Sequence, residues 1–261
     1  MLEIRNASCG YGAKTVVKDI SFSLAPGELL CLLGPNGVGK TTLFKTILGS
    51  LKLQAGTILL HGEDVSKWSR RRFARKVGYV PQAHTPPFPF RVIDVVTMGR
   101  TAHIGVFSSP SAHDVAIAEQ ALQNLGISYL RESIYTEISG GERQLVLIAR
   151  ALAQQPDILI MDEPTSNLDF GNQIKVLDHV REVAKKDRIS VILTTHYPNH
   201  ALMYASNTVL LGRNNKVTIG PPEEVITEKY LKDAYQVEAQ LHGIENRRGR
   251  KVTLCVPVVY A

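Results

Sequence analysis

The amino-acid sequence predicts an α/β fold with a mostly parallel β-sheet core, an antiparallel β subdomain at the N-terminus and a helical lobe in the middle. First, short apolar strands alternate with helical patterns over residues 29–50 and 156–220, which is typical of a parallel sheet. Second, residues 2–25 alternate around glycine turns, as antiparallel strands do. Third, residues 90–152 place apolar side chains three and four positions apart, which predicts successive helices.

The elements before the lobe follow from local signals. After the stop at Pro26-Gly27, the run "LLCLLG" predicts a buried strand, and "KTTLFKTILGS" has helical spacing that ends at Gly49. The segment "GTILLHGEDV", residues 56–65, predicts an edge hairpin. The segment "KVGYVPQ" predicts a short strand that is closed by its proline.

The lobe and the last third of the chain are predicted in the same way. Three helices are expected in "FRVIDVVTMGR", "SAHDVAIAEQALQNLG" and "GERQLVLIARALAQQ", after the proline-rich residues 84–90. The strands "PDILIMDEP", "ISVILTTH" and "TVLLGRNNKVTIG" follow, with a helix between the first two and, from Glu223, a short helix and a last strand, "KVTLCVPVVY". We therefore expect one domain, residues 1–261, with residues 84–152 as the helical lobe and residues 1–83 and 153–261 as the core.

Composition excludes several classes of protein. The 261 residues carry a formal net charge of +6, from 30 Lys and Arg against 24 Asp and Glu, and the excess is scattered. The basic runs at residues 70–72 and 247–251 indicate a solvated surface, and we expect no nucleic-acid partner. The three widely spaced cysteines, Cys9, Cys31 and Cys255, indicate reduced thiols in a reducing compartment.

No segment of the sequence is predicted to cross a membrane. The apolar runs "ELLCLLG" and "DILIMDE" are far shorter than the ~20 residues that a spanning helix needs. The N-terminus, "MLEIRNASCGYG", has charges where a signal peptide needs its apolar region. We therefore expect the protein to stay in the cytosol and to reach a membrane only through a partner.

A glycine-rich loop carries the strongest chemical signal. "GPNGVGKT", residues 34–41, fits the pattern G-x-x-x-x-G-K-[ST] between a predicted strand and a predicted helix. The glycines let successive backbone amides point at a phosphate, Lys40 would reach the β- and γ-phosphates, and the Thr41 hydroxyl would bind Mg²⁺. The predicted nucleotide-binding residues of the loop are Gly34, Pro35, Asn36, Gly37, Val38, Gly39, Lys40, Thr41 and Thr42.

Polar residues at the ends of other predicted strands complete this chemistry. "ILIMDEP" ends in Asp162 and Glu163, and ligands of open α/β sheets bind at such carboxyl ends. We expect Asp162 to hold Mg²⁺ and Glu163 to polarise the attacking water. Gln82 would touch the metal or the water, and His196 would touch the γ-phosphate. For any one of these residues, an ordinary polar strand end is the alternative.

Five motifs together resemble the ATP-binding subunits of ABC transporters. These are "GPNGVGKTT", "PQ" at residues 81–82, "ISGGERQ", "ILIMDEPTSNLD" and "TTH", in the order of that family and over essentially the whole chain. The resemblance implies a P-loop NTPase fold of the ABC type that hydrolyses ATP with Mg²⁺. It further implies that Tyr11 stacks on adenine.

The resemblance also explains a second anion-binding turn. It implies that two copies of the chain pair head to tail, so that Ser139, Gly140 and Gly141 of one copy close on the γ-phosphate held by Lys40 of the other. The amides at a helix N-terminus fit that role. Glu142 stands where many members have Gln, and we expect its carboxylate to turn away from the phosphate.

The lobe resembles that of a particular group of importers. Its pattern "MGR…H…F…P…D" is similar to subunits that import ferric siderophores, haem, cobalamin, molybdate or tungstate, and residues 84–110 would receive a helix of the permease. Ordinary packing of the lobe around Phe88 and Phe90 is the alternative for this segment. The expected partners are a second copy, a membrane permease dimer and, indirectly, a substrate-binding protein, at the cytoplasmic face of the inner membrane. An exporter subunit or a soluble ABC ATPase without a transport role is the alternative.

Overall fold

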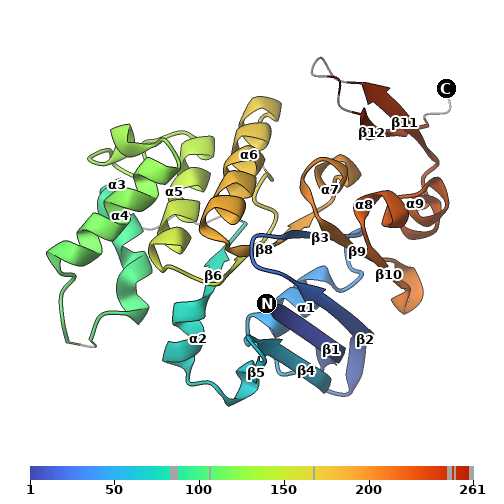
Figure 1. Ribbon diagram of the computed structural model, residues 1–261, viewed down its shortest axis with the longest axis horizontal. Helices are drawn as coiled ribbons and strands as arrows, with labels where there is room; N and C mark the ends of the chain where they lie inside the picture. The colour runs from blue at the N-terminus through green and yellow to red at the C-terminus, as the bar shows by residue number, and fades with distance from the viewer. Residues whose placement is uncertain (83–87, 106, 167, 246–248, 250, 259–261) are drawn as a thin grey trace. The chain divides into compact units, whose positions relative to one another are not determined.

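The structure is a computed structural model that describes residues 1–82, 88–105, 107–166, 168–245, 249 and 251–258. It contains two compact units (Figure 1): residues 1–66 with 192–261, called unit 1, and residues 67–191, called unit 2. Residues 84–87 and Val106 of the predicted permease groove lie outside the described residues, as do Asn167 of the motif "TSNLD" and residues 247, 248 and 250 of the second basic run. The predicted helical lobe belongs to unit 2.

Unit 1 begins with the predicted antiparallel subdomain. Four strands lie in the order β2-β1-β4-β5, and β1 pairs antiparallel with both of its neighbours. Their bounds are Leu2–Tyr11 (β1), Lys14–Leu24 (β2), Ala55–Leu60 (β4) and Glu63–Asp64 (β5). The side chains of Leu2, Ile4, Ala7 and Cys9 are buried, which explains the alternating pattern of the sequence.

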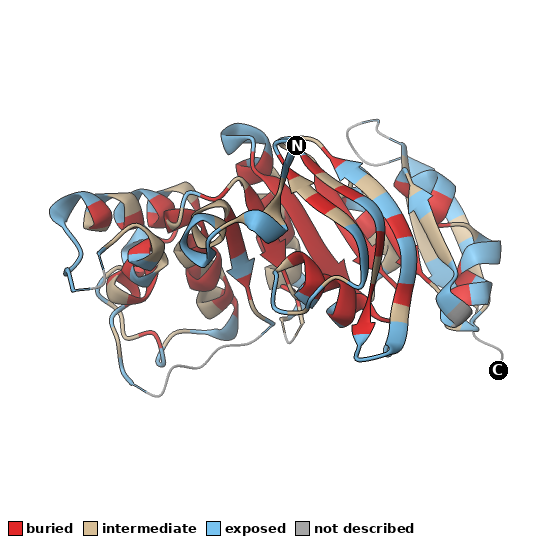
Figure 2. Ribbon diagram, turned by 90° about the horizontal axis from the view of Figure 1, so that it is seen from below, coloured by how far each residue is buried: buried red, intermediate tan, exposed pale blue. Residues whose placement is uncertain are grey.

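A second sheet contains the predicted parallel strands. Its order is β10-β9-β3-β8-β7-β6, and the division between the units falls within β8 (Ser190–Thr195). In unit 1, β3 (Leu29–Leu33) is parallel to β9 (Asn207–Leu211), whereas β10 (Val217–Gly220) is antiparallel to β9. Every residue of β3 and β8 is buried (Figure 2), as expected of strands that are covered on both faces.

The helices of unit 1 and its last strands follow from similar signals. The helices are α1 (Lys40–Ile47), α7 (Pro198–Tyr204), α8 (Pro222–Val225), α9 (Glu228–Tyr235) and the 3₁₀ turn η4 (Arg213–Asn215). The strand predicted near the C-terminus is β12 (Lys251–Pro257), and it forms an antiparallel hairpin with β11 (Ala239–Glu245), which the sequence analysis did not predict. The β12 strand packs against α7.

Unit 2 combines two parallel strands with helices. The strand β6 (Val77–Val80) is parallel to β7 (Ile158–Met161). The helices are α2 (Arg70–Lys76), α3 (Val92–Thr97), α4 (Ala112–Asn124), α5 (Gly140–Ala153) and α6 (Phe170–Asp187), with 3₁₀ turns η2 (Met98–Ala102) and η3 (Ser128–Leu130), and η1 (Val65–Lys67) at the junction with unit 1. The helices α3, α4 and α5 lie side by side (Figure 1). Among the described residues, no helix has the length and apolar character needed to cross a membrane.

A buried ion pair fastens the lobe. Arg100 lies in η2, which continues α3 as a tighter turn where one longer helix was predicted. Its guanidinium donates to Asp114 of α4 at 3.0 Å and to the carbonyl oxygen of Ala153 in α5 at 2.9 Å. Hydrogen bonds from Ser111 and then from Arg100 lower the pKa of Asp114 to about 2. Three elements of unit 2 are therefore joined at one arginine.

Candidate functional site

The glycine-rich loop of unit 1 joins β3 to α1 in a form that requires glycine. Gly34 and Gly39 have φ of 149° and 110°. A Cβ on Gly34 would overlap the carbonyl oxygen of Leu211, and one on Gly39 would lie 2.7 Å from a methyl group of Val17. The loop therefore keeps its curl only with glycine at both positions.

Lys40 lies inside this loop. Its Nζ donates to the carbonyl oxygens of Gly34 at 2.5 Å and Pro35 at 2.9 Å, and it lies 3.3 Å from Nδ1 of His196. Because an ammonium group can only donate, Nδ1 of His196 is the acceptor of that contact. The residue is 6% exposed. The structure thus brings together two predicted site residues that lie far apart in the sequence.

The start of α1 has the form of an anion site. Its N-cap is Gly39, which has no side chain that could bind the first amides of the helix. Those amides carry the positive end of the helix dipole, so they suit a phosphate. Thr41 is exposed in the first turn, whereas Thr42 is buried. At the end of β1, Tyr11 is 51% exposed, so its ring has an open face for a planar base.

In unit 2, Asp162 and Glu163 follow directly after β7. Glu163 has φ of 45°, a left-handed conformation that is unfavourable for a residue before proline. Such a conformation costs about 1–3 kcal/mol and is often found at functional sites. The backbone N–H and the hydroxyl of Ser166 donate to the carbonyl oxygen of Glu163 at 3.0 and 2.9 Å. These bonds hold the strained turn.

Gln82 meets Glu163 within unit 2. Because β6 and β7 are parallel neighbours, their carboxyl ends lie together, and Nε2 of Gln82 donates to Glu163 at 3.1 Å. Asp162 is fixed by a bond from its N–H to the carbonyl oxygen of Val80. Among the described residues there is no group of three or more His, Cys, Asp and Glu able to hold a metal. The oxygens of Gln82 and Asp162 in unit 2 are of the kind that Mg²⁺ prefers, and so is the Thr41 hydroxyl in unit 1.

The turn "SGG" begins α5. Ser139 is its N-cap and forms a capping box with Glu142, while Gly140 is exposed and Gly141 is buried against Asn172 of α6. The expected position of Glu142 in the first turn is confirmed. Its carboxylate accepts hydrogen bonds from Ser139 and from the hydroxyl of Tyr129, and its expected orientation away from the phosphate stays a prediction. These bonds, from Ser139 first, lower the pKa of Glu142.

The basic run at residues 70–72 is exposed, as predicted for a solvated surface, and two of its arginines also make specific contacts. Arg71 donates to the carbonyl oxygens of Ala102 and Ile104 at 3.1 and 3.0 Å, and Arg75 donates to Ala102 at 2.9 Å. Arg72 instead lies over the ring of Trp68, 4.2 Å from its centroid. The charge run alone did not reveal these contacts, because the carbonyl groups come from a distant segment.

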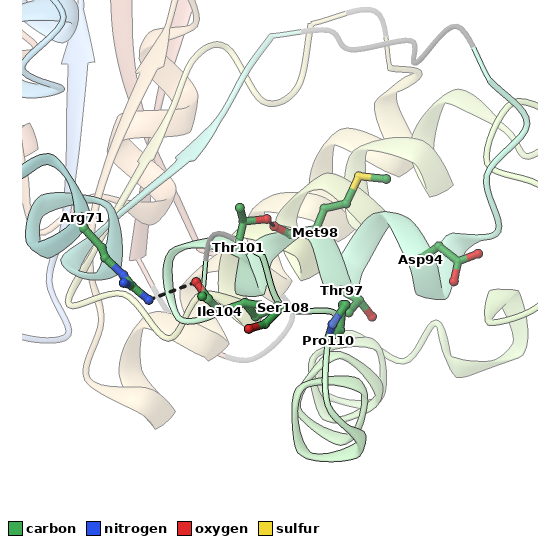
Figure 3. Close-up of a pocket in the computed structure, with 9 residues that line it drawn as sticks. Arg71, Asp94, Thr97, Met98, Thr101, Ile104, Ser108 and Pro110 are labelled. Atoms are coloured by element: carbon green, nitrogen blue, oxygen red, sulfur yellow. Dashed lines mark hydrogen bonds between the residues drawn. The ribbon is translucent and has the colours of Figure 1, made fainter.

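A cavity of about 610 Å³ is lined in part by Arg71. Figure 3 shows Arg71 pointing to Ile104, with side chains of α3, η2 and the following segment around the hollow. Its lining residues are Arg71, Asp94, Thr97, Met98, Thr101, Ile104, Gly105, Ser108 and Pro110. A second cavity, of about 560 Å³, shares Met98 and Thr101 with it and extends to Pro81, the residue before Gln82.

Comparison with known proteins identifies the family. The sequence profile of a family described as ABC transporter matches residues 17–166 of this chain. An uncharacterized ABC transporter ATP-binding protein of Haemophilus influenzae is 44% identical, over 92% of this chain and 91% of that protein. The molybdate import ATP-binding protein MolC of the same organism is 36% identical, over 88% and 86%. The hemin import ATP-binding protein HmuV of Thermobifida fusca is 36% identical, over 92% and 84%.

A solved structure supports the same conclusion. It is described as an inward-facing conformation of a metal-chelate type ABC transporter, and it matches with a TM-score of 0.88 at 33% identity, over 99% of this chain and 97% of that chain. The ABC-type P-loop fold predicted from the sequence is therefore confirmed. The chain belongs to the ABC transporter family and is an ATP-binding subunit of it, an ATPase whose hydrolysis of ATP is coupled to transport.

Proposed function

We propose that this ATPase powers the import of a metal chelate or an oxyanion through a separate membrane permease. The observation that carries the proposal is the groove formed in unit 2 by the two cavities that share Met98 and Thr101. The groove combines the apolar side chains of Met98 and Ile104 with the hydroxyl groups of Thr97, Thr101 and Ser108. Methionine adapts to irregular partners, and amphipathic helices commonly bind in such grooves.

The groove also connects the proposed permease contact with the residues proposed for ATP hydrolysis. Its second part reaches Pro81, whose neighbour Gln82 is hydrogen-bonded to Glu163. Its first part is bounded by the segment that Arg71 and Arg75 hold. A permease helix that shifts in the groove would therefore move Gln82 and alter its contact with Glu163.

In this proposal each unit supplies its own set of site residues for ATP. Unit 1 supplies the amides of the loop, Lys40 and His196 for the phosphates, and Tyr11 for the adenine ring. Unit 2 supplies Asp162 and Gln82 as ligands for Mg²⁺ and Glu163 as the base that takes a proton from the attacking water. In unit 1, the Thr41 hydroxyl is the proposed metal ligand. Bound Mg²⁺ neutralises charge on the phosphates.

Two copies of the chain form the working ATPase. Ser139, Gly140 and Gly141 of one copy close on the γ-phosphate bound by the other, because the start of α5 presents amides and a positive dipole end. ATP then favours the closed pair, and loss of the γ-phosphate releases it. The subunit works at the cytoplasmic face of the inner membrane, with a substrate-binding protein as an indirect partner and without nucleic acid.

The cargo class rests on the relatives. The proteins named for molybdate and hemin import, together with the metal-chelate type structure, match nearly the whole chain, including the lobe that carries the groove. We therefore propose an iron-siderophore, haem, cobalamin or molybdate/tungstate cargo. An exporter subunit, or a soluble ABC ATPase without transport, is the alternative.

Uptake by cells tests the transport role. A strain without this chain is compared with the same strain complemented by the wild type or by Glu163→Gln, using labelled ferric hydroxamate, haemin, cyanocobalamin and molybdate. Import predicts that uptake of one cargo falls in the deletion strain and returns only with the wild type. Normal uptake of all four in the deletion strain, or faster export of a cargo by the wild type, contradicts the proposal.

Dimerisation is tested on the purified protein. Glu163→Gln is expected to run as a monomer without nucleotide and as a dimer with ATP and Mg²⁺ in size-exclusion chromatography. Tight dimers in the absence of ATP would contradict a switch driven by nucleotide.

A further inference from the structure

Both chain neighbours of His196 take part in one hydrogen-bonded cluster in unit 1. The hydroxyl of Thr195, the last residue of β8, accepts a bond from the backbone N–H of Tyr197 at 3.1 Å. The same hydroxyl lies 3.1 Å from Nδ1 of His200, which belongs to α7. The Thr195 hydroxyl thus bridges the turn that carries His196 and connects this turn to α7.

His200 places a polar ring in a buried position, where such a ring normally needs a hydrogen-bond partner. The ring is 7% exposed, and burial lowers the pKa of His200 to about 4, so it is neutral at physiological pH. With the amide of Tyr197 donating to the Thr195 hydroxyl, the hydroxyl proton is available to Nδ1 of His200. The ring of Tyr197 lies against His200, with centroids 5.0 Å apart. The polar atom of a buried ring is therefore used to hold the turn of His196.

The helix α7 is itself held by the C-terminal hairpin. The side-chain amide of Asn199 donates to the carbonyl oxygen of Cys255 at 3.2 Å, and its oxygen accepts from the N–H of Cys255 at 2.7 Å. Asn199 therefore occupies both backbone groups of one residue of β12, as a neighbouring strand would. A continuous chain of contacts runs from β12 through Asn199 and His200 to Thr195.

We propose that Thr195, His200 and Asn199 are positioning residues for His196, and that through them the β11/β12 hairpin sets the placement of His196. The inference rests on the proposed role of His196 at the γ-phosphate. Since Nδ1 of His196 contacts Lys40 at 3.3 Å, a small rotation of the turn would break that contact. The hairpin thereby influences hydrolysis without touching the nucleotide.

The experiment compares paired variants of the full chain. Thr195→Val removes the hydroxyl and keeps the shape, whereas Thr195→Ser keeps the hydroxyl. Loss of one such hydrogen bond corresponds to roughly a two- to tenfold change in a rate or equilibrium constant. Thr195→Val is therefore expected to lower kcat by that factor, and Thr195→Ser is expected to keep the kcat of the wild type. The KM for ATP and the binding of a non-hydrolysable analogue are expected to stay within about twofold, because none of the three residues binds the nucleotide.

The contact between α7 and β12 is tested with a separate variant. Asn199→Ala is expected to lower kcat in the same direction, and its partly exposed position makes it the second variant if Thr195→Val does not fold. His200→Phe keeps the stacked ring without Nδ1 and is expected to behave as Thr195→Val does. Thermal unfolding of each variant verifies that the loss of rate is measured on folded protein.

A double-mutant cycle with His196→Ala separates the two proposals. If Thr195 acts through His196, Thr195→Val lowers the residual turnover of His196→Ala no further. An equal loss in both backgrounds, or an unchanged kcat in Thr195→Val and Asn199→Ala, overturns the positioning role. Normal turnover of His196→Ala alone instead overturns the proposed role of His196.

Discussion

A single carboxylate oxygen of Glu142 accepts both hydrogen bonds that Ser139 can donate, from its N–H at 2.9 Å and from its hydroxyl at 2.7 Å. The second oxygen accepts from Tyr129 at 3.0 Å. The serine proposed to bind the γ-phosphate of a partner subunit thus has its only hydroxyl proton engaged. If this hydroxyl donates to that phosphate, its proton must first leave the Glu142 carboxylate.

The substitution Glu142→Gln tests how much this engagement matters. Gln can still accept from Ser139 and complete the capping box, and it removes a negative charge near the phosphate site. ATPase activity is therefore expected to stay within about tenfold of the wild type, measured by phosphate release. Ser139→Ala is the control, since it removes the donor itself; a loss of more than tenfold in Glu142→Gln would contradict the replaceable role of the carboxylate.

The substitution Glu163→Gln is expected to stop hydrolysis while ATP still binds. Removal of a general base typically lowers kcat ~10²–10⁴-fold, and the amide preserves the shape of the side chain next to Gln82. Single-turnover hydrolysis and equilibrium binding of ATP measure the two effects separately. Turnover near the wild-type rate would rule out Glu163 as the base.

The substitution Lys40→Ala is expected to weaken nucleotide binding itself. The ammonium group would be exchanged from two carbonyl oxygens of the loop to phosphate oxygens, and charge-assisted hydrogen bonds contribute about 1.5–3 kcal/mol each, or roughly 10–100-fold in affinity. Titration with a fluorescent ATP analogue measures this loss. Unchanged affinity would show that the loop amides suffice.

The substitution Asp114→Asn tests the ion pair that fastens the lobe. The pKa of Asp114 is lowered to about 2 from about 3.9 in an unfolded chain, so its contribution to stability is full above pH ~4 and is lost as the pH falls toward 2. Asn is expected to lower the free energy of unfolding at neutral pH, with a difference from the wild type that shrinks over this window. Urea unfolding at several pH values measures it, and a constant difference would contradict the assignment.

The substitution Arg71→Ala tests the wall of the groove. Loss of its bonds to Ala102 and Ile104 is expected to loosen the proposed permease contact, so that transport falls several-fold while the ATPase rate of the isolated subunit is unchanged. Arg72→Ala is the matched control on the same helix, because Arg72 lies over Trp68 instead. Equal transport defects in the two variants would point to general charge effects.

Much of the fold was predictable because its signals are local. The buried strand β3 and the helices α4 and α5 follow from apolar spacing, and the loop at Gly34 follows from glycine needed at positive φ. The helix α2 was missed because it buries no residue completely, so its sequence has no apolar stripe. The strand β11 was missed because polar residues interrupt it and its pairing partner β12 lies beyond a turn.

For the candidate site, the sequence predicted which residues take part but not the contacts between their side chains. Motif spacing identified which residues carry the charges and hydroxyls, as with Lys40 and Glu163. It did not give the hydrogen bonds of the Glu142 carboxylate to Ser139 and Tyr129, because Tyr129 lies 13 positions before Glu142. The bond between Asn199 and Cys255 joins residues 56 positions apart, and no pattern of residue types specifies such a contact.

The carbonyl oxygens of Gly34 and Pro35 act on Lys40 as a template that fixes the loop before ATP arrives. The protein therefore does not need to order a flexible segment when the nucleotide binds; it exchanges one set of acceptors for another. Preorganisation of this kind reduces the entropic cost of association. Binding of ATP should accordingly need little rearrangement of the loop itself.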